Sequence, residues 1–254
     1  MSDDLLDVAV DAARAAGTIL LEHYERGVRE VTTKSTPTDL VSEADLEAER
    51  AIREILTERR PGDAILGEEG DDIAGTTGLR WVVDPLDGTV NYLFAIPQWA
   101  VSVACEGQVG VIFDPLRDEL FSVRAGEEAE LDGTPLRGSR RDDLGTAMVS
   151  TGFGYDARVR AAQAEVVARL LPQVRDIRRL GSAALDLAWL AAGRYDAYYE
   201  YGLNAWDWAA GEMLCTAAGL EVRHLGALPG TGAGLLVAAP GIVDAMEAIV
   251  SPGA

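Results

Sequence analysis

Carboxylates stand at the ends of several predicted helices and strands, and few other side chains in this sequence could do chemistry. They are Asp39 and Asp45 in DLVSEAD, Glu68 and Glu69 in GEEG, Asp84 and Asp87 in DPLDGT, and Asp207 in WDWAAG. The two histidines, His23 and His224, are expected to be structural. Acid–base chemistry therefore falls to carboxylates, hydroxyl groups or metal-bound water, and histidine triads and multi-histidine zinc sites are disfavoured.

The DPLDGT motif brings two of these acids together. A buried strand delivers Asp84, a proline fixes the backbone, and Asp87 follows, so both carboxylates can face one point together with the Leu86 carbonyl. Gly88 and Thr89 then stand at a predicted helix start, where free backbone N–H groups favour an anion. Carboxylates that could bind cations therefore lie beside backbone N–H groups that could bind an anion, and this combination predicts a metal-dependent phosphate site.

The charge of such a cluster has to be neutralised. Two carboxylates about 4 Å apart repel each other by roughly 4 kcal/mol at an effective dielectric constant of about 20. Three or four carboxylates must therefore share protons or bind cations, and an all-oxygen ligand set without histidine favours Mg²⁺. Two or more such ions can bind a phosphate, generate hydroxide and stabilise the leaving oxygen.

Each acidic motif also has an ordinary structural explanation when it is taken alone. DPLDG is compatible with a turn and a helix cap, and Asp45 with a capping box that pairs it with Ser42. Glu68 and Glu69 are compatible with a solvated loop, and Asp207 with the first turn of a helix, where the dipole favours an acid. The order of the motifs along the chain favours function over these separate explanations.

This ordered pattern resembles the inositol monophosphatase family of lithium-sensitive, Mg²⁺-dependent phosphatases. The matching blocks are KSTPTDLVSEAD, GEEG, WVVDPLDGTVNY, RRLGSAALDLAWLAAGRYDAYYEYG and WDWAAGEMLCTAAG, which span residues 34–219 in the family's order. The resemblance implies a layered α+β and α/β sandwich of alternating helix and sheet layers, with a fructose-1,6-bisphosphatase-like fold. It also implies a homodimer, and an active site where an N-terminal antiparallel sheet meets a C-terminal α/β part.

The resemblance implies two or three Mg²⁺ ions per active site. The implied ligands are Glu68, Asp84 and the Leu86 carbonyl for the first ion, Asp84, Asp87 and Asp207 for the second, and Glu68 again for a weaker third. By the same resemblance, Asp45 and Thr89 would orient and deprotonate the attacking water, and Glu69 would support a metal-bound water.

The resemblance also implies the substrate contacts. The implied residues, which bind phosphate or line a polyol site, are Asp87, Gly88, Thr89, Gly181, Ser182, Ala183, Glu200 and Asp207. We therefore expect hydrolysis of a small phosphate monoester without a phosphoenzyme, with inositol 1-phosphate as the first choice of substrate. Relatives with the same metal core hydrolyse fructose-1,6-bisphosphate, histidinol phosphate or adenosine 3′,5′-bisphosphate, so these substrates stay open.

Three positions stand out against the family pattern. Val90 replaces a second threonine common after DGT, and Asn204 stands near the polyol pocket where some animal members have histidine. Lys34 is the only lysine beside 21 arginines, and it falls on a family lysine near the mobile lip of the site. Asn204 therefore leaves the fine substrate preference open, and Lys34 is a candidate accessory residue.

Hydrophobic periodicity predicts the elements that must position these residues. Helices are predicted over residues 4–26, 42–60, 156–171, 182–193, 206–219 and 240–250, and strands over 64–69, 80–85, 99–107, 108–115, 119–127, 147–152, 174–180, 195–202 and 235–240. We expect one domain over residues 1–254, with a soft boundary near residue 140. Residues 1–140 would form an α+β part with an antiparallel meander, and residues 141–254 an α/β part.

The composition disfavours partners that are held by a basic surface. The formal net charge is −20, and residues 39–91 alone contain 14 acidic residues and 5 arginines, so nucleic acid and anionic membranes are poor partners. The acidic N-terminus, the two cysteines and the lack of an apolar run of about 18–20 residues favour a cytoplasmic protein.

Another class of function is suggested by STGFGYDARVRAAQ. Gly152, Gly154 and Ala157 have the G-x-G-x-x-A spacing between a predicted strand and helix, and Asp176 lies 24 residues beyond the first glycine. A dinucleotide-binding module at residues 147–176 would require the two flanking strands to be parallel neighbours. The arginine-rich stretch 137–179 has two explanations, a partner surface or a solvated face with ion pairs to the acid surplus.

Overall fold

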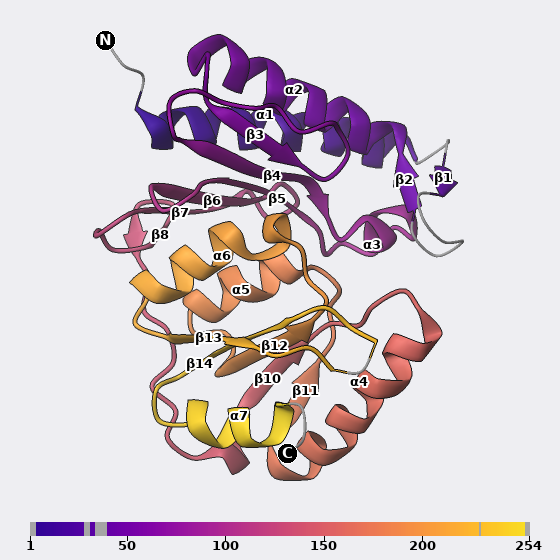
Figure 1. Ribbon diagram of the computed structural model, residues 1–254, viewed down its shortest axis with the longest axis vertical. Coiled ribbons are helices and arrows are strands. Elements are labelled where there is room, and N and C mark those ends of the chain that lie inside the picture. Colours follow the sequence, from indigo (N-terminus) through magenta and orange to yellow (C-terminus); the bar gives the residue numbers. More distant parts are fainter. Residues whose placement is uncertain (1–3, 28–30, 34–39, 229, 252–254) are drawn as a thin grey trace.

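The protein folds into alternating layers of helices and sheets (Figure 1). The computed structural model describes residues 4–27, 31–33, 40–228 and 230–251. In order, the layers are α1 (Leu5–Arg26) with α2 (Glu43–Arg59), a seven-stranded sheet, α5 (Ala183–Ala191) with α6 (Ala205–Ala217), a five-stranded sheet, and α4 (Ala157–Leu170) with α7 (Val243–Val250). The expected layered sandwich is confirmed.

The seven-stranded sheet contains the predicted antiparallel meander. Its strands, in spatial order, are β3 (Ala64–Gly67), β4 (Arg80–Asp87), β5 (Ala100–Cys105), β6 (Val109–Asp114), β7 (Glu119–Arg124), β8 (Glu130–Leu131) and β9 (Thr134–Pro135). Only β3 and β4 run parallel, and the separate β1 (Val31–Thr33) and β2 (Leu40–Ser42) form an antiparallel pair. The sequence did not predict β8 and β9, because two residues are too few to show an alternating pattern.

The five-stranded sheet is mixed. Its strands, in spatial order, are β11 (Asp176–Arg178), β10 (Met148–Thr151), β12 (Ala197–Tyr201), β14 (Gly234–Ala238) and β13 (Glu221–Leu225). β10 runs parallel to β11 and β12, whereas β14 is antiparallel to β12 and β13. The sequence did not predict β13, because only Leu225 of its five residues is buried and no apolar alternation marks it.

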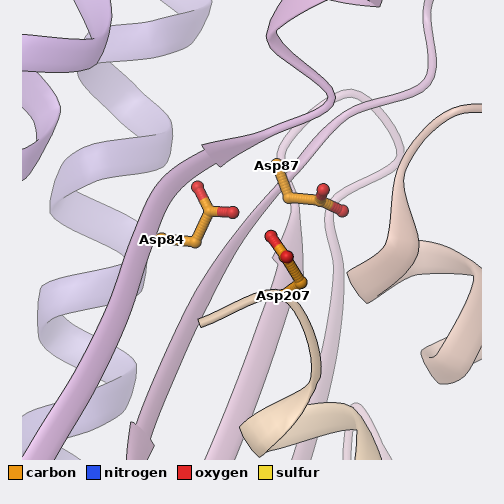
Figure 2. Close-up of side chains that lie close together, drawn as sticks. All are labelled: Asp84, Asp87 and Asp207. Atoms are coloured by element: carbon orange, nitrogen blue, oxygen red, sulfur yellow. The ribbon is translucent and has the colours of Figure 1, made fainter. Parts of the chain in front are cut away.

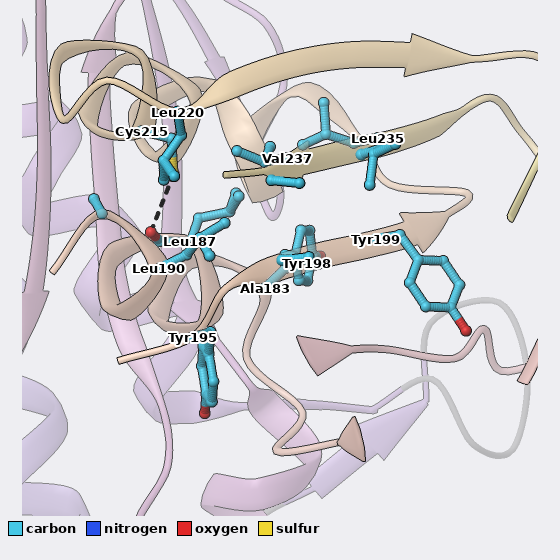
Figure 3. Close-up of a cluster of buried hydrophobic side chains, with 14 of the residues drawn as sticks. Ala183, Leu187, Leu190, Tyr195, Tyr198, Tyr199, Cys215, Leu220, Leu235 and Val237 are labelled. Carbon is cyan, nitrogen blue, oxygen red and sulfur yellow. Dashed lines mark hydrogen bonds between the residues drawn. The ribbon is translucent and has the colours of Figure 1, made fainter. Parts of the chain in front are cut away.

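The layer of α5 and α6 fills the space between the two sheets. Eight of the nine residues of α5 are buried, because the helix has protein on every side. Figure 3 shows Leu187, Leu190, Tyr198 and Cys215 in one buried cluster, in which the Cys215 thiol donates a hydrogen bond to the Leu187 carbonyl at 3.2 Å. Each buried leucine contributes roughly 1.5–3 kcal/mol relative to an exposed one, so this layer joins the two sheets firmly.

An aromatic cluster anchors the short helix α3 (Thr89–Leu93) that follows DPLDG. The Tyr92 ring lies 5.1 Å from the Trp99 ring and 5.4 Å from the Tyr24 ring, between centroids. The Tyr92 hydroxyl donates a hydrogen bond to the Leu20 carbonyl of α1 at 2.7 Å. The turn that carries the candidate phosphate-binding backbone is therefore fixed to the first helix layer.

None of the helices in the described part of the chain has the length and apolar character that a membrane span requires. Both cysteines, Cys105 and Cys215, are free and buried. Two residues named in the sequence analysis, Lys34 and Asp39, lie outside the described residues. The connector between the two sheets also contains the 3₁₀ turn η1 (Leu144–Thr146), and a second, η2 (Leu171–Gln173), follows α4.

Candidate functional site

Asp84 and Asp87 face the same point because the β4 ladder is irregular between them. Asp84 pairs with Ser102 of β5, and Asp87 with Ala100, so three steps along β4 match two steps along β5. Residues three apart in a regular strand point to opposite faces, and the one extra residue of the bulge restores the same face. β4 continues to Asp87 rather than ending before Leu86, and the Leu86 N–H donates to Asp84 Oδ1 at 2.9 Å.

Asp207 reaches the same point from the other half of the chain. It lies in the first turn of α6, where the backbone N–H of Asn204 donates to Asp207 Oδ2 at 2.6 Å in a capping box. Asp207 therefore caps the first turn of α6, as its sequence position alone suggested. The same carboxylate also points toward Asp84 and Asp87 (Figure 2). Carboxylate oxygens of the three aspartates lie within 4.8 Å of one another.

Burial and mutual repulsion raise the pKa values of this cluster. Burial, followed by the charges of Glu68, Asp87 and Asp207, holds the pKa of Asp84 well above its ordinary value. Burial and the neighbouring Asp87 do the same to the pKa of Asp207. Burial raises the pKa of Asp87 to about 6, although hydrogen bonds from the Ser182 hydroxyl and the Ala184 N–H oppose the shift.

This arrangement fits a hard divalent cation. Buried carboxylates that face one another are costly without an opposite charge. The donors are all oxygen, as Mg²⁺ and similar ions require, and they come from rigid strand and helix ends. Asp84, Asp87 and Asp207 therefore form an acidic cluster that could hold a metal ion.

Thr89 and Asp45 meet beside the cluster. The Thr89 hydroxyl lies 3.3 Å from Asp45 Oδ1 and 3.0 Å from the Leu86 carbonyl oxygen, and Asp45 is buried in the first turn of α2. Gly88, which precedes α3, has φ = +97°, and a Cβ there would lie 2.9 Å from the Gln98 carbonyl oxygen. Only glycine fits this tight turn without strain.

The acids line a cavity of about 370 Å³ between the two halves of the molecule. The expected residues in its wall are Glu68, Asp84, Leu86, Asp87, Gly88, Thr89, Gly181, Ala183, Glu200, Asn204 and Asp207. Gly181 has φ = +90°, and the carbonyl of the preceding Leu180 accepts a hydrogen bond from the Asn91 amide at 2.7 Å. That amide links the turn after DPLDG to the segment that precedes α5.

Glu200 also lines this cavity. The Tyr198 hydroxyl donates to Glu200 Oε2 at 2.8 Å. Burial raises the pKa of Glu200 to about 7, although the Tyr198 hydrogen bond and the charge of Arg179 oppose the shift. A Cβ on Gly152, at the end of β10, would lie only 2.0 Å from Glu200 Oε2. The space that this carboxylate occupies therefore depends on a glycine at position 152.

Comparison with known proteins identifies the chain's relatives. A model of the inositol monophosphatase family matches residues 1–248. The chain belongs to the inositol monophosphatase family. This membership makes it a phosphomonoester hydrolase, and it confirms the family resemblance of the sequence motifs.

Individual members of this family are similar over most of their length. The chain is 45% identical to inositol-1-monophosphatase SuhB of Mycobacterium tuberculosis H37Rv over 233 residues, which cover 86% of this chain and 80% of the relative. It is 40% identical to Nus factor SuhB of Escherichia coli K12 over 221 residues, which cover 85% and 83%. The crystal structure of extragenic suppressor protein suhB from Bartonella henselae has a TM-score of 0.88 at 34% identity, covering 98% of each chain.

Two residues that the family pattern names lie elsewhere than expected. Ser182 does not line the cavity, because its buried hydroxyl donates to Asp87 and accepts the Leu185 N–H as the cap of α5. Glu69 lines a groove along α2 rather than the cavity wall. The Ser182 hydroxyl is thus engaged by Asp87, and a contact of Ser182 with a polyol stays a prediction.

The cavity wall also contains residues that the sequence analysis missed. They are Gly152, Phe153, Gly154, Tyr155, Arg179, Tyr201, Gly202, Leu203 and Trp206. Arg179, Tyr201, Gly202 and Trp206 lie inside the blocks that resemble the family, but the sequence analysis assigned no cavity role to them. The glycine spacing that begins at Gly152 was interpreted as a nucleotide motif.

The glycine-rich segment meets one requirement of a dinucleotide module and fails another. β10 and β11 are parallel neighbours, as such a module needs. However, Gly152 lies against the Glu200 carboxylate, and Asp156 caps α4 by accepting the Arg158 N–H at 2.7 Å. Carboxylates at both places would repel a diphosphate, so the segment serves as a wall of the cavity instead.

The arginine-rich stretch is largely explained by local pairing. Within the described residues, ion pairs join Arg137 to Glu128, Arg141 to Asp196, Arg158 to Asp156 and Arg178 to Asp176. Arg175 donates to the Thr146 carbonyl, and Arg169 to the Ile249 carbonyl. These contacts favour the ion-pair explanation over a partner surface.

Proposed function

We propose that this protein hydrolyses inositol 1-phosphate to inositol and phosphate in a reaction that requires Mg²⁺. One observation carries the proposal: Asp84, Asp87 and Asp207 converge in a cavity whose wall also holds the half-buried Glu200. The first group of acids suits cations that bind a phosphate, and Glu200 suits hydroxyl groups of a polyol. The name of the M. tuberculosis relative, inositol-1-monophosphatase, supports this substrate.

In this proposal the acidic cluster is the metal centre. Glu68, Asp84 and the Leu86 carbonyl would hold one Mg²⁺, and Asp84, Asp87 and Asp207 another, with Glu68 contributing to a third. When bound there, Mg²⁺ supplies Lewis acidity and the positive charge that an anionic substrate needs in an anionic protein. Lithium, a competitor for such sites in this family, is expected to inhibit the reaction.

The proposed nucleophile is water held by Thr89 and Asp45. The Thr89 hydroxyl, 3.3 Å from Asp45 Oδ1, donates a hydrogen bond to that carboxylate and leaves its oxygen lone pairs to accept from the water. As the water attacks, its proton would pass to the Thr89 oxygen while the Thr89 proton passes to the buried Asp45 carboxylate, so Asp45 gains one proton and Thr89 stays neutral. Direct attack by water needs no phosphoenzyme, and the cavity wall, among the described residues, contains neither histidine nor cysteine.

The remaining wall residues would hold the substrate. The backbone N–H groups of Gly88 and Thr89 bind phosphate oxygens at the start of α3. The backbone near Gly181 and Ala183 and the Glu200 carboxylate take the polyol hydroxyls, and Asp207 lies near the ester oxygen. Asn204 at the rim contributes to substrate preference.

A phosphate-release panel tests the substrate. We expect kcat/KM with Mg²⁺ to be highest for inositol 1-phosphate, compared with fructose-1,6-bisphosphate, histidinol phosphate and adenosine 3′,5′-bisphosphate. Glu200→Gln should lower kcat/KM for inositol 1-phosphate, while 4-nitrophenyl phosphate, which has no hydroxyl groups for Glu200 to bind, should be affected little. A higher kcat/KM for another substrate of the panel would replace inositol 1-phosphate in this proposal.

We further propose that the enzyme works as a homodimer in the cytoplasm. Two apolar side chains beside the end of α3, Phe94 and Ile96, are 70% and 46% exposed, which suits burial against a second copy. The two free cysteines suit a reducing compartment.

A further inference from the structure

A partly buried ion pair beside the loop of Glu68 has no part in the function described so far. We infer that Glu49 and Arg53 of α2 position the loop that carries Glu68, and so set the affinity of the metal centre. This inference rests on the proposed function, because it assigns Glu68 to the metal. Neither Glu49 nor Arg53 lines the cavity, so both are positioning residues rather than catalytic residues.

Glu49 holds the backbone that directly follows Glu68. The residue is 2% exposed, its Oε2 accepts the Glu69 N–H at 2.7 Å, and its Oε1 accepts the Gly70 N–H at 2.9 Å. The β3 ladder ends one residue before Glu68, at Gly67. The Glu49 carboxylate therefore continues the hydrogen bonding of the loop where the sheet stops.

Arg53 completes the connection from the helix. Its Nε donates to Glu49 Oε1 at 2.5 Å, and its Nη1 donates to the Asp71 carbonyl at 2.9 Å. Its Nη2 is buried and has no hydrogen-bond partner among the residues that the structure describes, which is a cost to stability. Glu49 and Arg53 together therefore form hydrogen bonds with the backbone of the three residues that follow Glu68, from Glu69 to Asp71.

The two glycines of GEEG make room for this carboxylate. A Cβ on Gly67 would lie 2.5 Å from Glu49 Oε1, and a Cβ on Gly70 would lie 2.8 Å from the same atom. Side chains at either position would push the carboxylate away from the two amides. The GEEG motif therefore carries Glu68 and also leaves space for the Glu49 carboxylate. This space requires glycine at both ends of the motif.

Movement of this loop would change the metal centre. The Glu68 carboxyl shares a hydrogen bond with Asp84 and is among the charges that raise the pKa of Asp84. Partners that orient metal ligands from behind typically change metal affinity by about 10–100-fold when they are lost. Loss of the Glu49 hydrogen bonds should therefore weaken metal binding without touching the substrate.

Calorimetric titration of the metal-free protein with MgCl₂ tests the inference. The test variant is Glu49→Gln, which keeps the size of the side chain but turns an NH₂ group toward the backbone N–H of Glu69 or Gly70. The matched control variant is Asp196→Asn. Asp196 is also a buried carboxylate that accepts a backbone N–H, from Met148 at 2.8 Å, and pairs with Arg141. It precedes β12, at the opposite end of that strand from Glu200.

We expect Glu49→Gln to raise the Kd for Mg²⁺ by about tenfold or more. Its kcat at saturating Mg²⁺ should stay near the wild-type value, because Glu49 contacts no reacting atom. Asp196→Asn should lower the melting temperature and leave the Kd for Mg²⁺ within about twofold, since loss of a buried hydrogen bond alone changes stability. Wild-type Mg²⁺ affinity in folded Glu49→Gln, or an equal loss of affinity in Asp196→Asn, would overturn the inference.

A second variant covers the case in which Glu49→Gln does not fold. Arg53→Lys keeps the charge but loses the planar fork that joins Glu49 to the Asp71 carbonyl, so it should also raise the Kd for Mg²⁺. Unchanged affinity in folded Arg53→Lys would then contradict the inference. Failure of the proposed function has a different signature, because the wild-type protein itself would neither bind Mg²⁺ nor release phosphate.

Discussion

At the scale of single residues, the buried carboxylates make the stability of the metal-free protein depend on pH. In the folded state the pKa of Asp87 is about 6 and that of Glu200 about 7, both above their ordinary values. The folded state therefore binds more protons than the unfolded state between about pH 4 and pH 7. Stability that these acids contribute at low pH is lost as the pH rises through their folded pKa values.

The loss of stability with rising pH gives a prediction for Asp87→Asn. Without metal, the variant should be more stable than the wild type at pH 8, and this advantage should vanish at pH 5, where the wild-type carboxyl is protonated. Thermal unfolding in excess chelator at pH 5, 6, 7 and 8 measures both. Addition of Mg²⁺ should raise the wild-type melting temperature more at pH 8 than at pH 5. An Asp87→Asn advantage that does not grow with pH would contradict the account.

Single residues also show where sequence reasoning succeeds and where it stops. Asp84 and Asp87 could be paired from sequence, because the turn that joins them is only four residues long. Glu49 could not be assigned, because its partners lie about twenty residues away and its helix carries several other acids. Ser182 matched the family pattern, yet its hydroxyl is used by Asp87, a contact across 95 residues.

At the scale of elements, the end of β10 determines the shape of the cavity beside Glu200. Gly152→Ala would place a Cβ 2.0 Å from Glu200 Oε2 and displace that carboxylate. We expect a loss of about 1–3 kcal/mol in stability and a fall of up to about 100-fold in kcat/KM for inositol 1-phosphate. Urea unfolding and phosphate release measure the two effects.

A matched glycine provides the control for this variant. Gly145, in η1, has negative φ and only the Asp143 carboxylate within ordinary contact of a Cβ, at 3.4 Å. Gly145→Ala should therefore leave kcat/KM unchanged. Equal kcat/KM values for Gly152→Ala and the wild type would show that Glu200 is not held where the structure places it.

Most elements could be predicted from periodicity, and the exceptions have physical causes. The sequence predicted a strand over residues 80–85, whereas β4 runs to Asp87 through a bulge that only its pairing with β5 makes visible. β13 has a polar surface and β8 and β9 are two residues long, so none of them has a clear alternating pattern. The elements that carry the acids, β4 and α6, were predicted close to their observed bounds.

At the scale of the whole molecule, the site exists only because two halves of the chain meet. Asp84 and Asp87 come from the seven-stranded sheet and Asp207 from the helix layer beneath it. Periodicity cannot show that α5 and α6 lie between two sheets, and this part of the fold was expected from the family resemblance alone. The division into a single domain with a boundary near residue 140 stays a prediction.

The oligomeric state gives a prediction at this scale. If Phe94 and Ile96 are buried between two copies, Phe94→Glu should shift the mass in solution from two chains to one, because a buried charge without a partner is costly. Leu171→Glu is the control, since Leu171 is 51% exposed and lies in η2, away from α3. Size-exclusion chromatography with light scattering measures the mass. A single-chain mass for the wild type would exclude the homodimer.

The most direct test of the central claim is phosphate release from inositol 1-phosphate by the wild type and by Asp84→Asn. The account predicts turnover by the wild type with Mg²⁺ and none in excess chelator. It predicts that Asp84→Asn keeps its fold and loses more than about 1,000-fold in kcat, because several kcal/mol of transition-state stabilisation depend on the metal centre. Substantial turnover by Asp84→Asn, or by the wild type in chelator, would contradict the account.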